Sequence, residues 1–419
     1  VWQHRLWIRH DMSTVDGRPV HIIDQGLLNR DSGPDFFNAK VKIGGQIWSG
    51  NIEIHVRASD WHRHGHDSDP AYDSVILHVV DKDDMPVYRT NGELIPQMRM
   101  PCSRDFGDRF RSMVENTASE LACSSEISSV PQVHLTGWID SLAYQRLYAK
   151  TDRIASLVER FNGDWEEACY VTLARALGFG INGEPFQRLA LSLPLRFMRK
   201  HSDSLLAMEA LLFGQAGLLD KTHGYDPYVE RITSEYRFLA TKFSLRQPQS
   251  LGWKTARMRP PNFPHRRIAL LAAMMHGGFR MMHSITDARN ATDAEALFRS
   301  PLTGYWASRF TFGPDSGREL PVLSEPSIRI LLINVVVPMM YAYGLSRDDS
   351  AMCQRAIDML QHLPAEHNSI TNMFTKAGIN CRDAFTSQAL IELRRSFCET
   401  RKCLYCRIGH RLLAAKTRP

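Results

Sequence analysis

Two carboxylates and a histidine stand at a spacing that could gather them around a metal ion. Asp35 precedes a stretch with strand character, and Glu53 and His55 stand in a second such stretch. Gly44 and Gly45 separate the stretches, as in a hairpin turn. Carboxylates that meet across a hairpin can bind a divalent cation, which can activate water against a phosphodiester. We therefore expect Asp35 and Glu53 to ligate Mg²⁺ or Mn²⁺, and His55 to act as a catalytic, water-orienting base.

The elements that must position these residues are short strands. Residues 39–43 alternate between apolar and basic side chains, which is the pattern of a half-buried strand. Residues 46–56 continue as the second strand of the hairpin, and Glu53 and His55 project from one face because they are two positions apart. Residues 74–80, rich in apolar and β-branched side chains, predict a third strand.

A histidine-rich segment follows the hairpin. His62, His64 and His66 alternate within residues 60–69 and are flanked by acids. Imidazole ligands favour Zn²⁺ or Mn²⁺ over Mg²⁺, so His64 and His66 are candidate metal ligands. A substrate-binding rim and a polar loop of solvated histidines are the alternatives. His78 lies within the apolar third strand, where a hydrogen-bonded core histidine is the expected role.

The sequence Pro34-Asp35, followed by a strand, a turn and a strand with Glu53-Ile54-His55, resembles the core of the PD-(D/E)XK nuclease superfamily. In this sequence His55 stands where the usual lysine would be. The resemblance implies a restriction-endonuclease-like mixed α/β core, a divalent metal at the acidic residues and hydrolysis of nucleic acid.

Further phrases spread along the chain match a second family. They include Gly33-Pro34-Asp35-Phe36, Glu53-Ile54-His55, His64-Gly65-His66, Val75-Ile76-Leu77-His78-Val79-Val80, Asn262-Phe263-Pro264 and Cys403-Leu404-Tyr405-Cys406. On these phrases nearly the whole chain resembles an uncharacterised bacterial family known as a domain of unknown function, number 2851. That resemblance implies a shared architecture and leaves the reaction open.

Three of the eight cysteines cluster near the end of the chain. Cys398, Cys403 and Cys406 follow a C-x4-C-x2-C spacing, which in a chain without a secretory signal favours a structural metal over disulfides. Zinc is the first expectation, with Cys381 or His410 as the fourth ligand. The superfamily resemblance adds an iron–sulfur cluster as an option. Buried thiols on a terminal helix are the alternative.

Two segments concentrate positive charge. Residues 253–267 hold five basic residues and no acid, and residues 394–419 hold eight Lys or Arg and one acid. Cations interleaved with aromatic residues suit phosphate contact and base stacking, so nucleic acid is the expected partner. Pairing with acidic helix faces and a solvated basic surface are the alternatives. The candidate nucleic-acid-binding residues are Lys254, Arg257, Arg259, Arg266 and Arg267.

The composition is that of a globular protein, with 43% hydrophobic and 23% charged residues. From about residue 133 the apolar spacing becomes helical. We therefore expect an α+β fold, with a nuclease-like α/β domain over residues 1–125 and a mostly α-helical domain over residues 133–419 that carries the cysteine cluster. No uninterrupted apolar run reaches the roughly 18 residues of a membrane span, and no apolar signal segment opens the sequence. A cytoplasmic protein without a membrane partner is expected.

These observations lead to one leading function and two alternatives. The leading function is a metal-dependent nuclease that hydrolyses nucleic-acid phosphodiesters with Asp35, Glu53 and His55. The first alternative is a non-catalytic module that binds nucleic acid or protein on the same scaffold. The second is a metallohydrolase of another substrate class, built on His55, His64 and His66.

Overall fold

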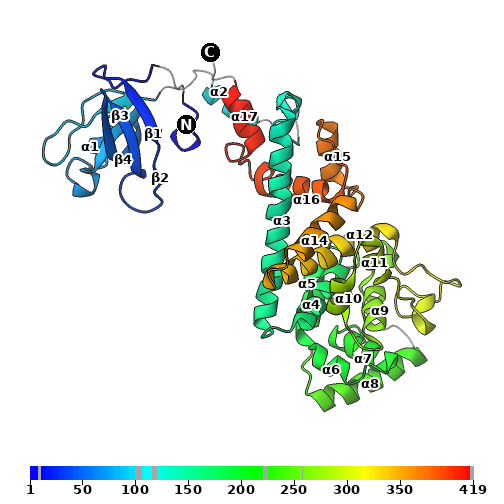
Figure 1. The fold of residues 1–419 in the computed structure, drawn as a ribbon. Helices are drawn as coiled ribbons and strands as arrows, with labels where there is room; N and C mark the ends of the chain where they lie inside the picture. Colours follow the sequence, from blue (N-terminus) through cyan, green and yellow to red (C-terminus); the bar gives the residue numbers. More distant parts are fainter. Residues whose placement is uncertain (8–10, 101–105, 116–119, 220–224, 257, 416–419) are drawn as a thin grey trace. The chain divides into compact units, whose positions relative to one another are not determined.

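The computed structural model describes the chain except for residues 8–10, 101–105, 116–119, 220–224, 257 and 416–419 (Figure 1). The chain divides into two compact units. The first, called here the sheet unit, comprises Val1–Trp138, Met373–Ile379 and Leu393–Pro419, and the second, the helical unit, comprises Ile139–Asn372 and Asn380–Glu392. The C-terminal segment, which the sequence assigned to the helical domain, thus groups with the sheet unit.

One mixed sheet forms the framework of the sheet unit. Its strands are β1 (Val20–Asp24), β2 (Leu27–Leu28), β3 (Phe36–Ile43), β4 (Gln46–Arg57), β5 (Val75–Lys82) and β6 (Gln97–Arg99). The order is β1-β3-β4-β5-β6, with β2 also paired to β3. β1 and β4 pair antiparallel to β3, while β5 runs parallel to both β4 and β6.

The β3–β4 hairpin forms where the sequence predicts it. Gly44 and Gly45 both have positive φ angles, 56° and 92°, which a two-residue hairpin turn demands and glycine adopts freely. Alternate side chains of β3, among them Val41 and Ile43, are buried in the main core of this unit. The opposite face of the strand is polar, which accounts for the period-two pattern in the sequence.

The connection from β4 to the parallel strand β5 carries the histidine-rich segment. It contains α1 (Asp60–Arg63) and the short helix η2 (Pro70–Tyr72). Trp61 is fully buried in a second apolar cluster, where its indole N–H donates to the Tyr88 carbonyl over 3.2 Å. Burial of this large ring fixes the loop against the sheet.

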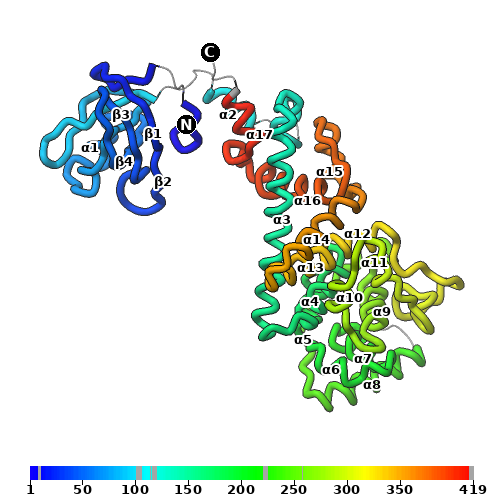
Figure 2. The backbone as a smooth tube through the Cα atoms, viewed as in Figure 1, coloured from blue at the N-terminus to red at the C-terminus, as the bar shows by residue number. Residues whose placement is uncertain are grey.

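The remaining helices of the sheet unit are η1 (Trp2–His4), α2 (Phe106–Glu115), η3 (Ile127–Ser129), η8 (Arg394–Cys398) and α17 (Arg407–Ala415). The rest of the fold is helical (Figure 2), and among the helices named next, residues 132–138, 373–376 and 393 belong to the sheet unit. The helices run in the order α3 (Gln132–Arg160), α4 (Trp165–Leu177), α5 (Gly183–Ser192), α6 (Leu195–Arg199), α7 (Leu205–Gln215), α8 (Pro227–Phe243), η5 (Pro260–Asn262), α9 (Pro264–Met275), α10 (Met281–Asp287), α11 (Ala291–Ala296), η6 (Gly304–Ala307), α12 (Glu325–Leu331), η7 (Leu332–Val336), α13 (Val337–Ser346), α14 (Ser350–His362), α15 (Ser369–Lys376) and α16 (Ala384–Leu393). The expected α+β class is confirmed, and the structure adds that the sheet is mixed. The finer restriction-endonuclease-like arrangement stays a prediction.

One helical stretch of the described residues, Glu325–Ser346, is long and apolar enough to cross a membrane. Most of its apolar window is buried inside the protein, as in the core helix of a soluble protein. Leu331, Val335 and Met339, for example, are fully buried. This burial accounts for the apolar sequence without a membrane.

Candidate metal centre

The hairpin brings Asp35 and Glu53 together. The backbone N–H of Asp35 donates to Glu53 Oε2 over 3.0 Å, and the backbone N–H of Ile54 donates to Asp35 Oδ2 over 3.0 Å. The Asp35 amide thus holds the Glu53 carboxylate, and the Ile54 amide holds the Asp35 carboxylate. Glu53 keeps its second oxygen, Oε1, for other partners.

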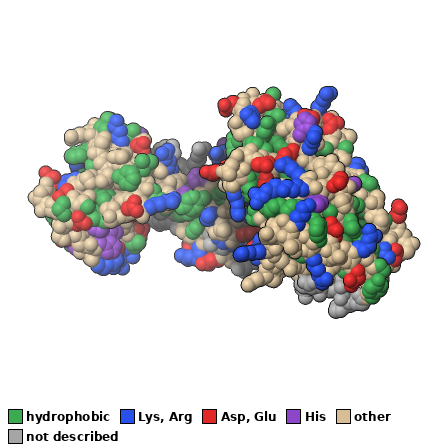
Figure 3. Space-filling model, turned by 90° about the horizontal axis from the view of Figure 1, so that it is seen from below, with side chains coloured by type: hydrophobic (Ala, Val, Ile, Leu, Met, Phe, Trp, Pro, Cys, Tyr) green, Lys and Arg blue, Asp and Glu red, His purple; other side chains and the backbone are tan. Residues whose placement is uncertain are grey.

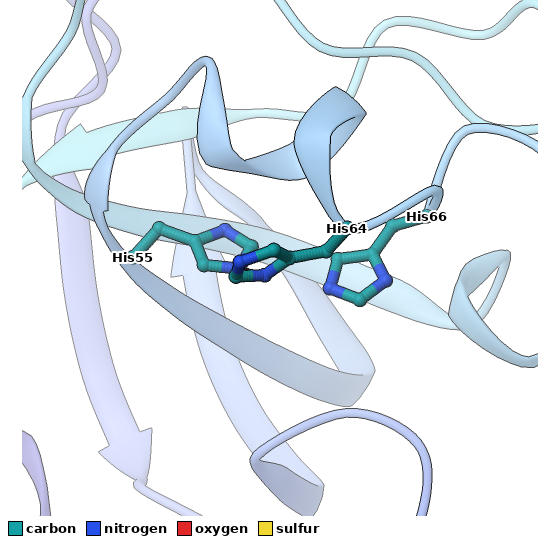
Figure 4. A group of neighbouring side chains, drawn as sticks. All are labelled: His55, His64 and His66. Atoms are coloured by element: carbon teal, nitrogen blue, oxygen red, sulfur yellow. Dashed lines mark hydrogen bonds between the residues drawn. The ribbon is translucent and has the colours of Figure 1, made fainter.

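Two histidines lie beside that second oxygen, and a third lies beside one of them. Glu53 Oε1 lies 3.4 Å from Nε2 of His55 and 3.4 Å from Nε2 of His66. His55 Nε2 also lies 3.1 Å from Nδ1 of His64. The three imidazoles each offer one nitrogen within 4.8 Å of the others, so their rings converge on a common point (Figure 4).

The loop after α1 directs His64 and His66 toward β4. Gly65, between them, has φ 76°, a conformation that glycine adopts without a steric penalty. His66 stacks on Tyr72 with ring centroids 3.7 Å apart, and the buried Trp61 meets its edge. His66 is therefore fixed by packing, whereas His64 is exposed to solvent.

His78 orients His55 from the neighbouring strand. It is fully buried in β5, and its Nε2 lies 2.9 Å from Nδ1 of His55. This hydrogen bond leaves Nε2 of His55 directed at Glu53 and His64. The expected core histidine is thus also the residue that sets the ring orientation of a candidate ligand, as outer-shell partners do at metal sites.

Burial controls the protonation of this cluster. Burial, and then the nearby Asp35 charge, raise the pKa of Glu53 to about 8, and burial also raises the pKa of Asp35. Burial, reinforced by neighbouring histidines, lowers the pKa of His55 to about 4 and that of His78 to about 3. The two imidazoles are consequently neutral near pH 7, which is the form that binds a metal.

The donor set fits a transition-metal ion. At metal–ligand distances of about 2.0–2.2 Å, adjacent ligand atoms are about 3.0–3.5 Å apart. The spacings around Glu53 Oε1 and His55 Nε2, from 3.1 to 3.4 Å, match that geometry. Imidazole with carboxylate suits Zn²⁺ or Mn²⁺ better than Mg²⁺. Asp35, expected as a ligand, uses Oδ2 for the Ile54 amide.

The five residues predicted to bind nucleic acid differ in their exposure to solvent. Lys254 and Arg259 are exposed in the helical unit, whereas Arg257 lies outside the described residues. Arg266 and Arg267 are 1% and 2% exposed. Their guanidinium groups donate to backbone carbonyls and to Asn262, and Arg267 also lies over the Phe179 ring, so their burial does not fit contact with nucleic acid.

The structure adds a fourth cysteine, Cys123, to the three C-terminal cysteines, and the spacing of those three did not indicate it. Cys398, Cys403 and Cys406 lie in the sheet unit, and Cys123, from the turn before η3, joins them. Cys381 belongs to the helical unit, and His410 contacts the His4 carbonyl over 2.8 Å through Nε2. A single cysteine far upstream carries no local signal, so sequence reasoning missed it.

Comparison with known proteins places the chain in a family without assigning its activity. No curated protein and no solved structure matches it. The resemblance to the PD-(D/E)XK core is therefore not supported by these comparisons. Residues 1–369 match the family described as "Protein of unknown function (DUF2851)", so the expected membership is confirmed and the chain belongs to this family.

Proposed function

We propose that this protein is a metal-dependent hydrolase of nucleic-acid phosphodiesters. Its metal ligands would be Glu53, His55, His64 and His66. The observation that carries the proposal is the convergence of one nitrogen from each of His55, His64 and His66, all within 4.8 Å of one another. Glu53 Oε1 lies 3.4 Å from Nε2 of both His55 and His66 and would complete the set. A Zn²⁺ or Mn²⁺ ion bound there would lower the pKa of a water ligand and polarise a phosphoryl oxygen.

The surrounding residues supply what such a centre needs. The amide of Asp35 fixes Glu53, and His78 fixes the ring of His55. Asp35 stands beside Glu53 with a pKa raised by burial, which suits it to accept a proton from an attacking water. His64 is exposed, so the centre opens to solvent on the side where a large substrate would approach.

A basic pocket in the same unit favours a polyanionic substrate. It has a volume of about 500 Å³, and its lining includes His134, Arg407 and Arg411 but no acid. Tyr405, which is 56% exposed, also lines it. Basic side chains beside an exposed aromatic ring suit phosphate contact and base stacking. On the face drawn in Figure 3, by contrast, Lys and Arg are interspersed with acidic side chains.

Cleavage assays with matched variants test the proposal. The full chain is incubated with Zn²⁺, Mn²⁺ or Mg²⁺ and labelled single-stranded DNA, duplex DNA or RNA. Glu53→Gln and His64→Ala are expected to lower the cleavage rate by more than about 100-fold, because loss of even an outer-shell group costs 10–100-fold. His62→Ala is the control, since His62 pairs with Asp67 over 2.9 Å outside the cluster. Undiminished cleavage by both variants would overturn the proposal.

The Asp35→Asn variant distinguishes two arrangements of metal ligands: one built mainly on histidines and one built on the carboxylates of Asp35 and Glu53. If Asp35→Asn abolishes a Mg²⁺-dependent cleavage that His64→Ala leaves intact, the PD-(D/E)XK-type arrangement with Asp35 and Glu53 as ligands is the correct one. Salt-sensitive binding without cleavage would instead identify the non-catalytic module. Hydrolysis of bis(p-nitrophenyl) phosphate alone, with every nucleic acid left intact, would indicate a metallohydrolase of another substrate class.

A further inference from the structure

Among its described residues the sheet unit holds four cysteines: Cys123, Cys398, Cys403 and Cys406. Cys398 ends η8, Cys403 and Cys406 lie between η8 and α17, and Cys123 lies in the turn that precedes η3. Arg394, in η8, donates to the carbonyl of Glu120, three residues before Cys123, over 2.5 Å, so the segment that carries Cys123 lies against η8. Cys123 also interacts electrostatically with the three C-terminal cysteines. The fold therefore brings to one place two segments that are far apart in the sequence.

The backbone around Cys406 is arranged to receive a thiolate. Cys406 immediately precedes α17, and the backbone N–H groups of Ile408 and Gly409 point at its sulfur. Amides at a helix N-terminus stabilise a thiolate. Gly409 also permits close packing, since a Cβ atom there would lie 2.4 Å from the Cys403 carbonyl oxygen. The turn between these two cysteines is thus held tightly.

A buried indole supplies a second, independent indication. Trp138 is only 8% exposed, and its N–H group has no nitrogen or oxygen acceptor among the described residues. It faces the sulfur of Cys406 instead. Arg394 lies near Cys398, and Arg401 lies near Cys403. An indole donor at the sulfur, with cations nearby, matches the negative charge of a thiolate-bound metal centre.

The four thiols are withdrawn from solvent to different degrees. Cys406 is 6% exposed, and Cys123, Cys398 and Cys403 are partly buried. Thiols that are shielded from solvent at one place suit a metal that binds them as thiolates.

We propose that Cys123, Cys398, Cys403 and Cys406 together bind a structural metal centre. The ligand class is a thiolate-binding metal, either one zinc ion or an iron–sulfur cluster. The only tight trio of ligand atoms among the described residues, within 4.8 Å of one another, is that of the histidines. No three of the four sulfurs lie within 4.8 Å of one another, so a single zinc would have to draw them together, whereas a cluster spans a larger distance.

Cys123 is a better fourth ligand than the two candidates that the sequence indicated. Cys381 belongs to the helical unit, where its charged neighbours are Asp383 and Glu366. His410 uses Nε2 on the His4 carbonyl. This proposal does not depend on the proposed hydrolase, because the cysteines and the histidine cluster share no residue.

Metal content, rather than activity, tests the centre. The full chain carrying His55→Ala and His64→Ala, which leaves the histidine cluster with two of its four proposed ligands, is purified without oxygen and assayed for zinc, iron and acid-labile sulfide. About one zinc, or about four irons with sulfide and visible absorbance, is expected per chain. Adding Cys123→Ser should reduce this content at least tenfold, whereas adding Cys381→Ser should leave it unchanged.

The two metals are distinguished by the same measurements, and either one supports the four ligands. X-ray absorption at the metal edge of the chain with all cysteines intact should find only sulfur from the protein around the metal, which tests the ligands even if Cys123→Ser fails to fold. Absence of stoichiometric metal, retention of metal by Cys123→Ser, or a nitrogen ligand would each overturn the proposal.

Discussion

Two sets of buried polar side chains, one in each unit, differ in how they are satisfied. In the helical unit, Arg266 donates to four backbone carbonyls, those of Trp306, Arg309, Leu320 and Pro321, at 2.8–3.0 Å. In the sheet unit, the imidazoles of His55 and His66 instead face each other and the buried Glu53. The buried arginine has acceptors fixed by the fold, whereas the histidine cluster is built of groups that all offer lone pairs.

This difference underlies our proposal that the arginine is structural and that the histidine cluster binds a metal. Carbonyls that surround a guanidinium compensate for its lost hydration, so the arginine ties chain segments together. Converging lone pairs repel unless a proton or a cation lies among them. Glu53 keeps its proton to a higher pH than usual: burial and the charge of Asp35 both disfavour its ionised form and so raise its pKa. A metal ion would reverse the preference.

The largest effect is expected when Arg266, whose Nη1 and Nη2 donate to these carbonyls, is removed. Arg266→Met in the full chain leaves four carbonyls without their donor and should destabilise the helical unit by about 3–5 kcal/mol. For a unit of this size that corresponds to about 6–20 °C in melting temperature. Differential scanning calorimetry measures the shift, with the exposed Lys254→Met as control. A change in melting temperature below about 2 °C would show that Arg266 does not hold these chain segments together.

Added metal should stabilise the sheet unit, which holds the histidine cluster, but not the helical unit, which holds Arg266. Mn²⁺ at about 100 times its dissociation constant should stabilise the sheet unit by about 2.7 kcal/mol and leave the helical unit unchanged. Mn²⁺ is chosen because thiolates prefer softer metals, which limits binding at the cysteines. Calorimetric scans with and without Mn²⁺ provide the comparison. An equal stabilisation of the His64→Ala protein would place the ion elsewhere.

A smaller effect is expected from pH in metal-free protein. The pKa of Glu53 is about 8 in the folded chain against an ordinary value of 4.5, so between these values the folded state binds the additional proton and rising pH favours unfolding. His55, with a folded pKa of about 4 against 6.5, acts oppositely only below pH 6.5. The free energy of unfolding should therefore fall by about 1–2 kcal/mol from pH 6.5 to 8.

Glu53→Gln isolates this contribution. Because the amide does not titrate, the variant should lack the part of the decrease that Glu53 causes, and subtraction of the two urea-denaturation series removes every other titrating group. The measurement requires a chelator, since bound metal favours the ionised carboxylate and would mask the trend. Parallel pH curves for the two proteins would show that Glu53 does not hold its proton.

Features of the two sites that depend on local sequence patterns could be predicted from the sequence. Strand alternation and Gly44-Gly45 indicated the hairpin that brings Asp35 beside Glu53. The same patterns contained no information on Arg266, because its carbonyl partners lie 40–55 residues away. Exposed and buried arginines look alike in a sequence. The contact between His55 and His78 likewise required the parallel pairing of β4 with β5.

The smallest stability effect is expected at the exposed cations of the helical unit, and it tests what remains of the predicted nucleic-acid interface. Lys254→Ala with Arg259→Ala should change stability by less than about 0.5 kcal/mol, since both side chains are exposed. If each contacts one phosphate, the slope of log affinity against log salt should become shallower by about 1.8 for duplex DNA. Fluorescence anisotropy over a salt series measures it. An unchanged slope would leave the basic pocket around Arg411 as the remaining site for the polyanion, because Arg266 and Arg267 are already engaged inside the protein.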